Sequence, residues 1–330
     1  MVRPKIVAGI DVGSSKITTI IASYSLPKES VNIAGVATIP SRGLRKAQII
    51  DIEEAIAAIT ESVERAERMA GFALSSVFVS IGGTHIESIN SKGVVAVAEP
   101  ETEIKKDDVK RVLESARAIS LPSSREILHV IPRNFIVDSQ GGIKDPLGMT
   151  GVRLEAEAHI ISVATGAMRN LTRSVNEVGI DVEGLVFTGV AASEAVLTET
   201  EKELGVCLVD IGGGTTDICV FQEGSLCFSS VLPVGAGHVT NDLAIGLRVS
   251  LESAEKIKRF LGKKKEKPIL PGDKKMGPEK DEVDLTSLKL PEELKSISEK
   301  TVVEGIIRPR LNASSRVLTV YTPSAFALNV

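Results

Sequence analysis

The chain has 330 residues, a length that suggests about two domains. Lysine and arginine total 39 against 43 aspartates and glutamates, a net charge of −4, which argues against a dedicated nucleic-acid-binding protein. Aromatic residues make up only 3% of the chain, so stacking platforms for single-stranded nucleic acid are not expected. Three cysteines without a Cys-x-x-Cys pair predict neither a disulfide framework nor a zinc site. Because no apolar run approaches about 18 residues, any membrane contact is predicted to be peripheral.

The first 83 residues read as an α/β arrangement. The predicted strands are 5–10, 17–22, 31–39 and 76–81. From Ile52 to Ala70 apolar residues recur at spacings of four and three, which predicts an amphipathic helix ended by Gly71.

Residues 84–158 depart from this pattern and are interpreted as a small α+β module inserted into the first domain. Strand-like runs at 94–97 and 134–137 flank a helix, and a Gly/Pro-rich loop follows at 141–148. The apolar face of that helix is predicted to carry Val109, Val112, Leu113, Ala116 and Ile119.

The α/β pattern resumes after residue 158. The predicted strands are 159–164, 182–187, 206–209, 218–222 and 226–232, and the predicted helices are 167–178, 191–203, 239–247 and 251–261. Residues 262–289 are rich in lysine and proline, which predicts a solvated loop, with a polybasic lipid contact as the alternative. Because proline suits a first helical turn, a helix is predicted from Pro291 to Ile307. After Leu311 no periodicity is evident.

Two segments 199 positions apart resemble each other. The first reads Ile-Asp-Val-Gly-Ser-Ser-Lys over residues 10–16, and the second reads Val-Asp-Ile-Gly-Gly-Gly-Thr-Thr-Asp over 209–217. Each is an apolar strand followed by an aspartate, a tight turn of small residues and a return strand. A single copy could be an ordinary hairpin with small turn residues. The same pattern in two copies favours a shared function. Neither copy matches the Gly-rich loops of P-loop or Rossmann proteins.

These residue types suit a bound polyphosphate. Glycines let backbone N–H groups approach an anion closely, and serine and threonine hydroxyls add donors. Asp11 and Asp210 are each placed to hold a hydrated Mg²⁺, and Lys16 to contact a phosphate oxygen. We therefore expect the two turns to face each other across one cleft, with both aspartates near one metal.

The duplicated hairpin resembles the two phosphate-binding loops of the actin-like ATPase superfamily, which includes actins, Hsp70 chaperones and sugar kinases. The resemblance implies two ribonuclease-H-like domains that close on Mg·ATP. It also implies a glycine-rich turn at Gly237 at the nucleotide, and Glu255 and Lys258 at ribose and adenine. The implied nucleotide-binding residues are Gly13, Ser14, Ser15, Lys16, Gly212, Gly213, Gly214, Thr215, Thr216, Gly237, Glu255 and Lys258.

The position of the inserted module is similar to that of the FtsA family of bacterial cell-division proteins. Only about a dozen residues separate Ile39 from Ile52, too few for the lobe that most actin-like families carry there. The FtsA-like stretches are 9–16, 80–83, 192–198 and 203–217. The resemblance implies a first subdomain (1–83 with 159–184), an SHS2-like insert (84–158), a second ribonuclease-H-like subdomain (185–261), a partial subdomain with the basic loop (262–311) and an atypical tail (312–330).

FtsA-like proteins form filaments on the cytoplasmic face of the cell membrane at the division site. The resemblance implies that this chain binds the C-terminal peptide of FtsZ, associates with itself and recruits later division proteins. Two departures qualify this expectation. Thr188 occupies the position where related ATPases place an acid or glutamine, so hydrolysis is expected to be weak. The family's adenine-side glycine turn and amphipathic membrane helix are not recognised after Leu311, so this chain alone is expected to bind lipid, ATP and the FtsZ peptide poorly and to be cytosolic, whereas Mg·ATP binding through the two turns is expected of an intact version.

Other functions fit the same fold. One is an actin-fold enzyme or chaperone ATPase, which would need a base near Thr188 and a substrate subdomain. Another is a scaffold similar to the pilus-assembly protein PilM, which shares the fold and the inserted module. The Gly-Gly-Gly-Thr-Thr-Asp run, together with residues 192–197, favours the cell-division role.

Overall fold

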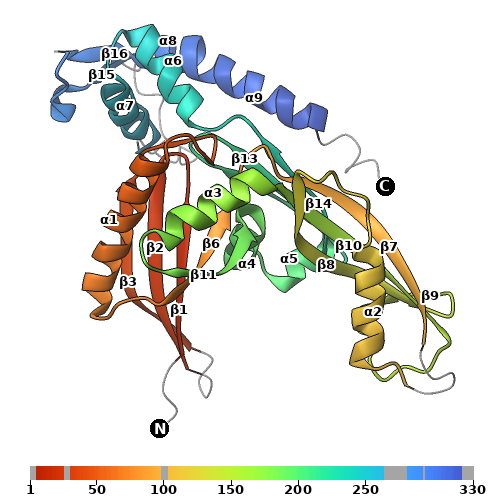
Figure 1. Cartoon of the computed structure of the whole chain (residues 1–330). Coiled ribbons are helices and arrows are strands. Elements are labelled where there is room, and N and C mark those ends of the chain that lie inside the picture. The colour runs from red at the N-terminus through yellow and green to blue at the C-terminus, as the bar shows by residue number, and fades with distance from the viewer. Residues whose placement is uncertain (1–4, 26–29, 98–102, 264–280, 293, 322–330) are drawn as a thin grey trace. The chain divides into compact units, whose positions relative to one another are not determined.

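The computed structural model describes residues 5–25, 30–97, 103–263, 281–292 and 294–321 (Figure 1). The chain divides into two compact units, Met1–Pro233 and Val234–Val330, and each is described by itself. Three larger sheets lie in the first unit. Among the described residues, no helix is both long and apolar enough to cross a membrane.

A five-stranded sheet forms the base of the first unit. Its strands are β1 (Lys5–Val12), β2 (Lys16–Ser25), β3 (Ser30–Pro40), β6 (Ser76–Ile81) and β11 (Asp181–Phe187), in the order β11-β6-β1-β2-β3. The first three strands pair antiparallel, whereas β6 is parallel to both β1 and β11. The four strands predicted in residues 1–83 are therefore confirmed.

Helix α1 (Ile52–Ala70) packs on this sheet, with α3 (Thr165–Asn176) alongside it. The carboxylate of Asp51 caps the start of α1 by accepting the Glu54 N–H, and Gly71 ends the helix in a left-handed conformation. Apolar side chains of β1, β2, β6 and α1 form one core. A small hairpin, β4 (Leu44–Arg45) with β5 (Gln48–Ile49), lies between β3 and α1 in the chain.

The inserted module folds around a four-stranded antiparallel sheet. Its strands are β7 (Glu87–Ala96), β8 (Arg125–Val137), β9 (Gln140–Ile143) and β10 (Arg153–Ala164), in the order β7-β10-β8-β9, and its helix is α2 (Lys106–Arg117). The module has a separate core that contains Val112 from α2 and Phe135 from β8. Ile119, expected on the same helical face, lies beyond the end of α2 and is not among the core residues.

A third sheet holds the second of the two similar hairpins. It consists of β12 (Val206–Ile211), β13 (Thr216–Gln222) and β14 (Ser225–Leu232). The helix expected over 191–203 is in fact two helices, α4 (Thr188–Val196) and α5 (Glu199–Leu204). The break lies at Thr198, whose hydroxyl caps α5 while Glu201 accepts the Thr198 N–H, so a capping box starts a new helix.

A polar network around the buried His159 joins the inserted sheet to β14. His159 on β10 lies 2.7 Å through Nδ1 from Oδ1 of Asn90 on β7, and 2.8 Å through Nε2 from Oγ of Ser229 on β14. Ser88 and Asn90 also donate to backbone carbonyls of β14. Burial, together with the positive charge of Arg133, lowers the pKa of His159 to about 4, so the imidazole is neutral at physiological pH.

The second unit is mainly helical over its described residues. It contains α6 (Gly237–Leu247), α7 (Leu251–Lys263), a short β15 (Glu282–Asp284) paired with β16 (Ser296–Ser298), and a 3₁₀ turn (Thr286–Leu288). A continuous helical stretch follows, made of α8 (Glu299–Val302), a π-helical turn (Val303–Ile307) and α9 (Arg308–Tyr321). The lysine-rich loop falls largely on residues 264–280, which lie outside the described residues.

The predicted start of the helix in this unit was wrong. Pro291 lies in a turn, and the helix begins after Ser298, whose hydroxyl accepts the Thr301 N–H. The side-chain cap at Ser298 therefore sets the start of the helix, eight residues or about two turns later than expected from the proline. Although the sequence shows no periodicity after Leu311, α9 continues to Tyr321.

Candidate functional site

The two similar segments form hairpin turns of the same geometry. In the first, the Gly13 N–H donates to the Lys16 carbonyl over 3.1 Å, and in the second the Gly212 N–H donates to the Thr215 carbonyl over 2.9 Å. In both hairpins the aspartate lies two residues before the turn glycine, on the strand that enters the turn. The sequence repeat therefore corresponds to a repeated backbone structure.

The structure brings the two turns into contact. A β-carbon added to Gly213 would lie 2.7 Å from Cβ of Ser15, and one added to Gly214 would lie 2.8 Å from Oγ of Ser14. Only glycine fits at these two positions, because any side chain would collide with the opposite turn. The expectation that the turns face each other is confirmed, but they touch in this conformation instead of bordering an open cleft.

A third element meets the two turns and was not anticipated from the sequence. The tip of the β4–β5 hairpin places the Ala47 N–H 2.7 Å from Oγ of Ser14, to which it donates, and Cα of Lys46 against Gly214. Lys46 and Ala47 both have left-handed backbone angles, with φ of 51° and 56°. Such conformations cost free energy in residues with a β-carbon and are typical of functional sites. The tip thus orients the serine hydroxyl of the first turn.

Asp11 has a fixed orientation. Oγ of Ser80, on the neighbouring strand β6, donates to Oδ1 of Asp11 over 2.6 Å and accepts the Val12 N–H over 3.2 Å. The serine therefore leaves Oδ2 of Asp11 available on the side of the turns. Ser80 lies in a stretch that resembles FtsA, but its link to Asp11 depends on strand pairing between residues far apart in the sequence.

Asp210 and Asp217 lie directly opposite each other on β12 and β13. Burial, with a further contribution from Asp11, raises the pKa of Asp210, and Lys16 opposes this rise. Asp217 is 5% exposed, and burial followed by the charges of Asp210 and Asp11 raises its pKa to about 7. Three carboxyl groups therefore repel one another at the turns. Asp217 is a site residue that the sequence analysis quoted without assigning it a role.

These carboxylates fit a hydrated divalent cation. Oδ1 of Asp217 is buried and has no hydrogen-bond partner in the part of the chain that the structure describes. Among the same residues, no three His, Cys, Asp or Glu side chains are arranged to hold a metal directly. Mg²⁺ characteristically keeps several waters and uses one or two carboxylates, so Asp11 and Asp210 are suitable for contact through water.

The remaining side chains of the turns differ in exposure. Ser15 and Lys16 are exposed, whereas Thr215 and Thr216 are buried. In this conformation the first turn therefore presents its side chains to solvent, and the second presents mainly the backbone of its three glycines.

A cavity of about 270 Å³ lies beside the first turn. Its lining includes Val12, Ser80, Gly82 and His85. Thr188 lies next to it, because a β-carbon on Gly82 would be 3.0 Å from Oγ1 of Thr188. Burial and the charge of Arg125 lower the pKa of His85 to about 4, so this imidazole is a neutral polar group near pH 7.

The three predicted site residues of the second unit come together within that unit. Glu255 accepts from Thr240 over 2.7 Å and pairs with Lys258 over 2.6 Å. Lys258 donates to Thr240 and to the carbonyl of Ala236, directly before Gly237. The network ties α7 to the start of α6 and holds the glutamate and lysine beside the glycine-containing turn.

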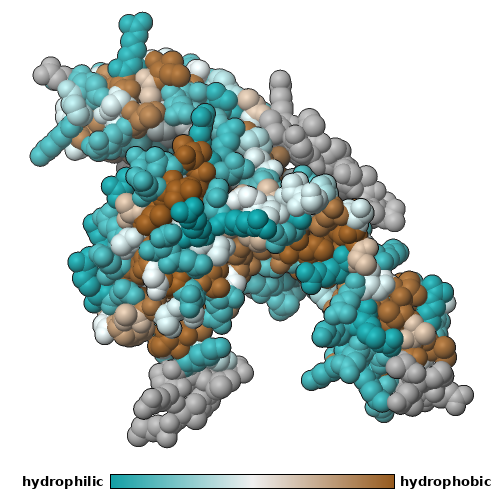
Figure 2. Space-filling model, viewed as in Figure 1, coloured by the Kyte–Doolittle hydropathy of each residue, from teal (hydrophilic) through white to brown (hydrophobic). Residues whose placement is uncertain are grey.

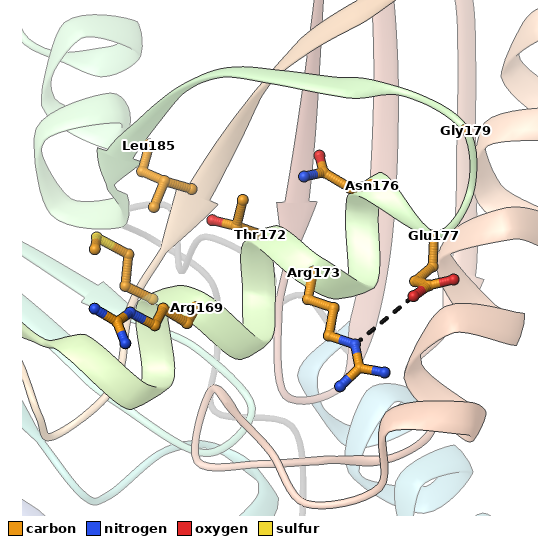
Figure 3. Close-up of a pocket in the computed structure, with 8 residues that line it drawn as sticks. Arg169, Thr172, Arg173, Asn176, Glu177, Gly179 and Leu185 are labelled. Atoms are coloured by element: carbon orange, nitrogen blue, oxygen red, sulfur yellow. Dashed lines mark ion pairs between the residues drawn. The ribbon is translucent and has the colours of Figure 1, made fainter.

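A wider groove lies away from the turns, between α3 and β11, and has a volume of about 600 Å³ (Figure 3). Arg169, Thr172 and Leu185 are among its lining residues. Arg173, one of the two arginines that line the groove, points toward Glu177 and forms an ion pair with it, with 3.7 Å between the charged groups. No residue predicted to bind nucleotide lines this groove.

The sheet order and the paired hairpins define an actin-like ATPase fold with an inserted SHS2 domain. Residues 83–162 match the family model described as "SHS2 domain inserted in FTSA". Among solved structures, the chain is similar to the "PilM-PilN type IV pilus biogenesis complex", with a TM-score of 0.56 at 17% identity over 78% of this chain and 70% of that one. At this identity the likeness concerns the fold alone.

Sequence relatives identify the family. Residues 207–308 match the family model for cell division protein FtsA. The FtsA of Pseudomonas aeruginosa is 41% identical over 77% of this chain and 60% of its own length, and that of Borreliella burgdorferi is 44% identical over 78% and 62%. The chain therefore belongs to the FtsA family of cell-division proteins. It spans about three fifths of the length of these relatives.

Proposed function

We propose that this chain binds Mg·ATP through the two contacting hairpin turns. The observation that carries this proposal is the convergence of two turns with the same backbone geometry, each preceded by an aspartate, at a point where only glycine fits. Their N–H groups and the Ser14 and Ser15 hydroxyls suit phosphate oxygens, and Lys16 suits the phosphate charge. A phosphate seated between Ser15 and Gly213 has to part the present contact.

Asp11 and Asp210 would hold the magnesium ion through water. The bound ion would supply positive charge that neutralises the phosphates and relieves the repulsion among the three carboxylates. Gly212, Thr215 and Thr216 would shape the second turn. Gly237, Glu255 and Lys258 would contact the nucleoside from the second unit.

Calorimetric titration of the protein with Mg·ATP tests the nucleotide site. Asp210→Ala should weaken Mg-dependent ATP binding by about ten-fold, which corresponds to about 1.4 kcal/mol. Asp181→Ala, at an exposed aspartate outside the hairpin turns, is the matched control and should bind like the wild type. Equal affinity for Mg·ATP in both variants and the wild type would contradict the assignment.

We further propose that hydrolysis is slow. Thr188 lies at the start of α4 beside the cavity, and its hydroxyl is not a general base near pH 7. Thr188→Ala should therefore leave the rate of phosphate release unchanged. A large loss of turnover in this variant, with ATP affinity retained, would show that the threonine orients the attacking water.

The whole protein is proposed to act as an FtsA-type scaffold. In this role it binds the C-terminal peptide of FtsZ, associates into filaments on the cytoplasmic face of the membrane and recruits later division proteins. The division into segments 1–83 with 159–184, 84–158, 185–261, 262–311 and 312–330 is part of this proposal. Fluorescence anisotropy of a labelled FtsZ C-terminal peptide, with a scrambled peptide as control, tests the first contact.

A further inference from the structure

The inserted module carries a groove of about 450 Å³ along α2, far in sequence from both hairpin turns. The residues that line this α2 groove are Lys106, Val109, Lys110, Leu113, Glu114, Arg117, Val130 and Leu147. Figure 2 shows apolar atoms among hydrophilic ones over the region where Figure 1 draws α2. Its volume is within the range of about 300–1,000 Å³ that ligand sites occupy.

Helical periodicity explains why one stripe of α2 faces the groove. The six lining residues from α2 are spaced three and one apart along the chain, which places them on one side of the helix. Val112 and Ala116 lie on another side and are fully buried. A β-carbon on Gly93 of β7 would collide with the backbone of both residues, so α2 packs tightly on the sheet and its orientation is fixed.

The floor of the groove is apolar and held in place by backbone bonds. Val109 and Leu113 are half-buried, and Leu147 is 40% exposed. The Gly148 N–H donates to the Ile104 carbonyl, and the Ile104 N–H donates to the Met149 carbonyl. These bonds fix the turn that carries Leu147 beside the start of α2. The exposed leucine is therefore part of a preformed apolar surface.

The rim of the groove is basic. Lys106, Lys110 and Arg117 are exposed, and none of them forms an ion pair with any residue in the described ranges. By contrast Arg111, on the far side of the same helix, pairs with Asp108 over 2.5 Å. Glu114 is the one acidic residue among those that line the groove, which leaves a net positive rim beside an apolar floor.

We propose that the α2 groove binds an acidic peptide segment of a partner protein, with aliphatic side chains on the floor and carboxylates at the lysines and arginine. Amphipathic segments bind apolar grooves in this way, and complementary charge guides their orientation. The concave shape favours a peptide over a flat lipid surface. The proposal gives the recruitment of partner proteins a defined ligand chemistry, and in that respect it rests on the proposed scaffold function.

Fluorescence anisotropy tests the proposal on the full chain. The probe is a short fluorescein-labelled peptide of glutamate, alanine and leucine, with its leucines at helical spacing, and a peptide with lysine in place of glutamate is its control. The double variant Lys106→Glu/Lys110→Glu should weaken binding of the acidic peptide about ten-fold at low ionic strength, and Leu147→Asn should weaken it in high salt as well. Arg68→Glu, a charge reversal at an exposed residue of α1, should have no effect.

Each outcome bears on the proposal. Acidic-peptide binding that is lost in the two groove variants and kept in Arg68→Glu supports it. Equal binding of the acidic and basic peptides, or undiminished binding by the double variant, overturns it. Binding to phosphatidylglycerol vesicles with no binding to the peptide overturns it in favour of a lipid surface. The affinity of the same variants for Mg·ATP should match that of the wild type. Measuring it separates a defect in the α2 groove from a defect in nucleotide binding at the hairpin turns.

Discussion

The two hairpins share a backbone and differ in their side chains. The first presents the Ser15 side chain and Lys16 to solvent, and Thr18 lies opposite Asp11. The second presents three glycines, and the buried Asp217 lies opposite Asp210. The two hairpins therefore differ in chemistry. The first carries hydrogen-bond donors and the positive charge of Lys16, whereas the second has glycines that allow close approach of the backbone and two facing carboxyl groups.

The largest effect on nucleotide binding is expected from filling the contact between the turns. In Gly213→Ala the new β-carbon lies 2.7 Å from Cβ of Ser15, so the turns must separate, and such overpacking costs about 1–3 kcal/mol. Both the free energy of unfolding, measured by urea denaturation, and the affinity for Mg·ATP should fall. Gly166→Ala in α3, where nothing lies within 4 Å, should not lower the free energy of unfolding. A fully stable Gly213→Ala variant that binds ATP normally would contradict the observed contact.

The second hairpin should give the protein a pH-dependent stability. The pKa of Asp217 is raised to about 7 in the folded state, above its ordinary value, so the folded state binds a proton that the unfolded chain has released. The contribution of Asp217 to the free energy of unfolding should therefore decrease as pH rises from about 4 to 7 and then level off, a change on the order of 4 kcal/mol. The lowered pKa values of His85 and His159 act in the opposite direction over this range, so the effect of Asp217 is the difference between the wild type and Asp217→Asn, which should lack this contribution.

Urea titrations at a series of pH values, without divalent cations or nucleotide, measure the effect of Asp217. The control is Asp181→Asn at an exposed position, which should keep the wild-type profile. An Asp217→Asn profile that coincides with the wild type would mean that Asp217 titrates normally and that the carboxylates do not repel one another.

A smaller effect is expected when the first hairpin is made like the second. Thr18→Asp places a carboxylate opposite Asp11, and like charges paired across strands destabilise by up to about 1 kcal/mol. The loss should be smaller at high ionic strength, because salt screens the repulsion between the two carboxylates. Thr38→Asp removes the same Thr18–Thr38 hydroxyl contact without facing Asp11, so it separates the charge effect from the lost contact.

The smallest effect on the free energy of unfolding is expected at the tip of the β4–β5 hairpin. Ala47→Gly relieves a left-handed backbone conformation and should raise the free energy of unfolding by at most about 1 kcal/mol. Ala57→Gly, at an exposed position inside α1, should instead lower it by about 1 kcal/mol. A destabilised Ala47→Gly variant in thermal melts would argue against strain at the tip.

Local patterns predicted much of this molecule. The amphipathic period of α1, with Asp51 and Gly71 at its ends, gave a helix close to the observed one. The paired motifs predicted both hairpin turns. The prediction at Pro291 failed because a proline permits a first helical turn without requiring one, and the side-chain cap at Ser298 decides where the helix begins.

Long-range pairing explains most of what was missed. β8 was expected only at 134–137 but extends over Arg125–Val137, because Pro132 lies at a register shift opposite Ala158, where a strand tolerates its missing N–H. The bond from Ser80 to Asp11 and the contact of Lys46 with Gly214 depend on which strands become neighbours. No local pattern contains that information.

The hydrogen bonds of the buried His159 with Asn90 and Ser229 affect how the second turn can move. They fasten β14 to the inserted sheet, and β14 is hydrogen-bonded to β13, which leaves the second turn at Thr216. If a ligand displaces this turn, either the inserted sheet moves together with it or the hydrogen bonds of His159 break. A ligand that displaces the turn would therefore couple its own binding to the position of the inserted sheet, and the coupling free energy would be the same in both directions.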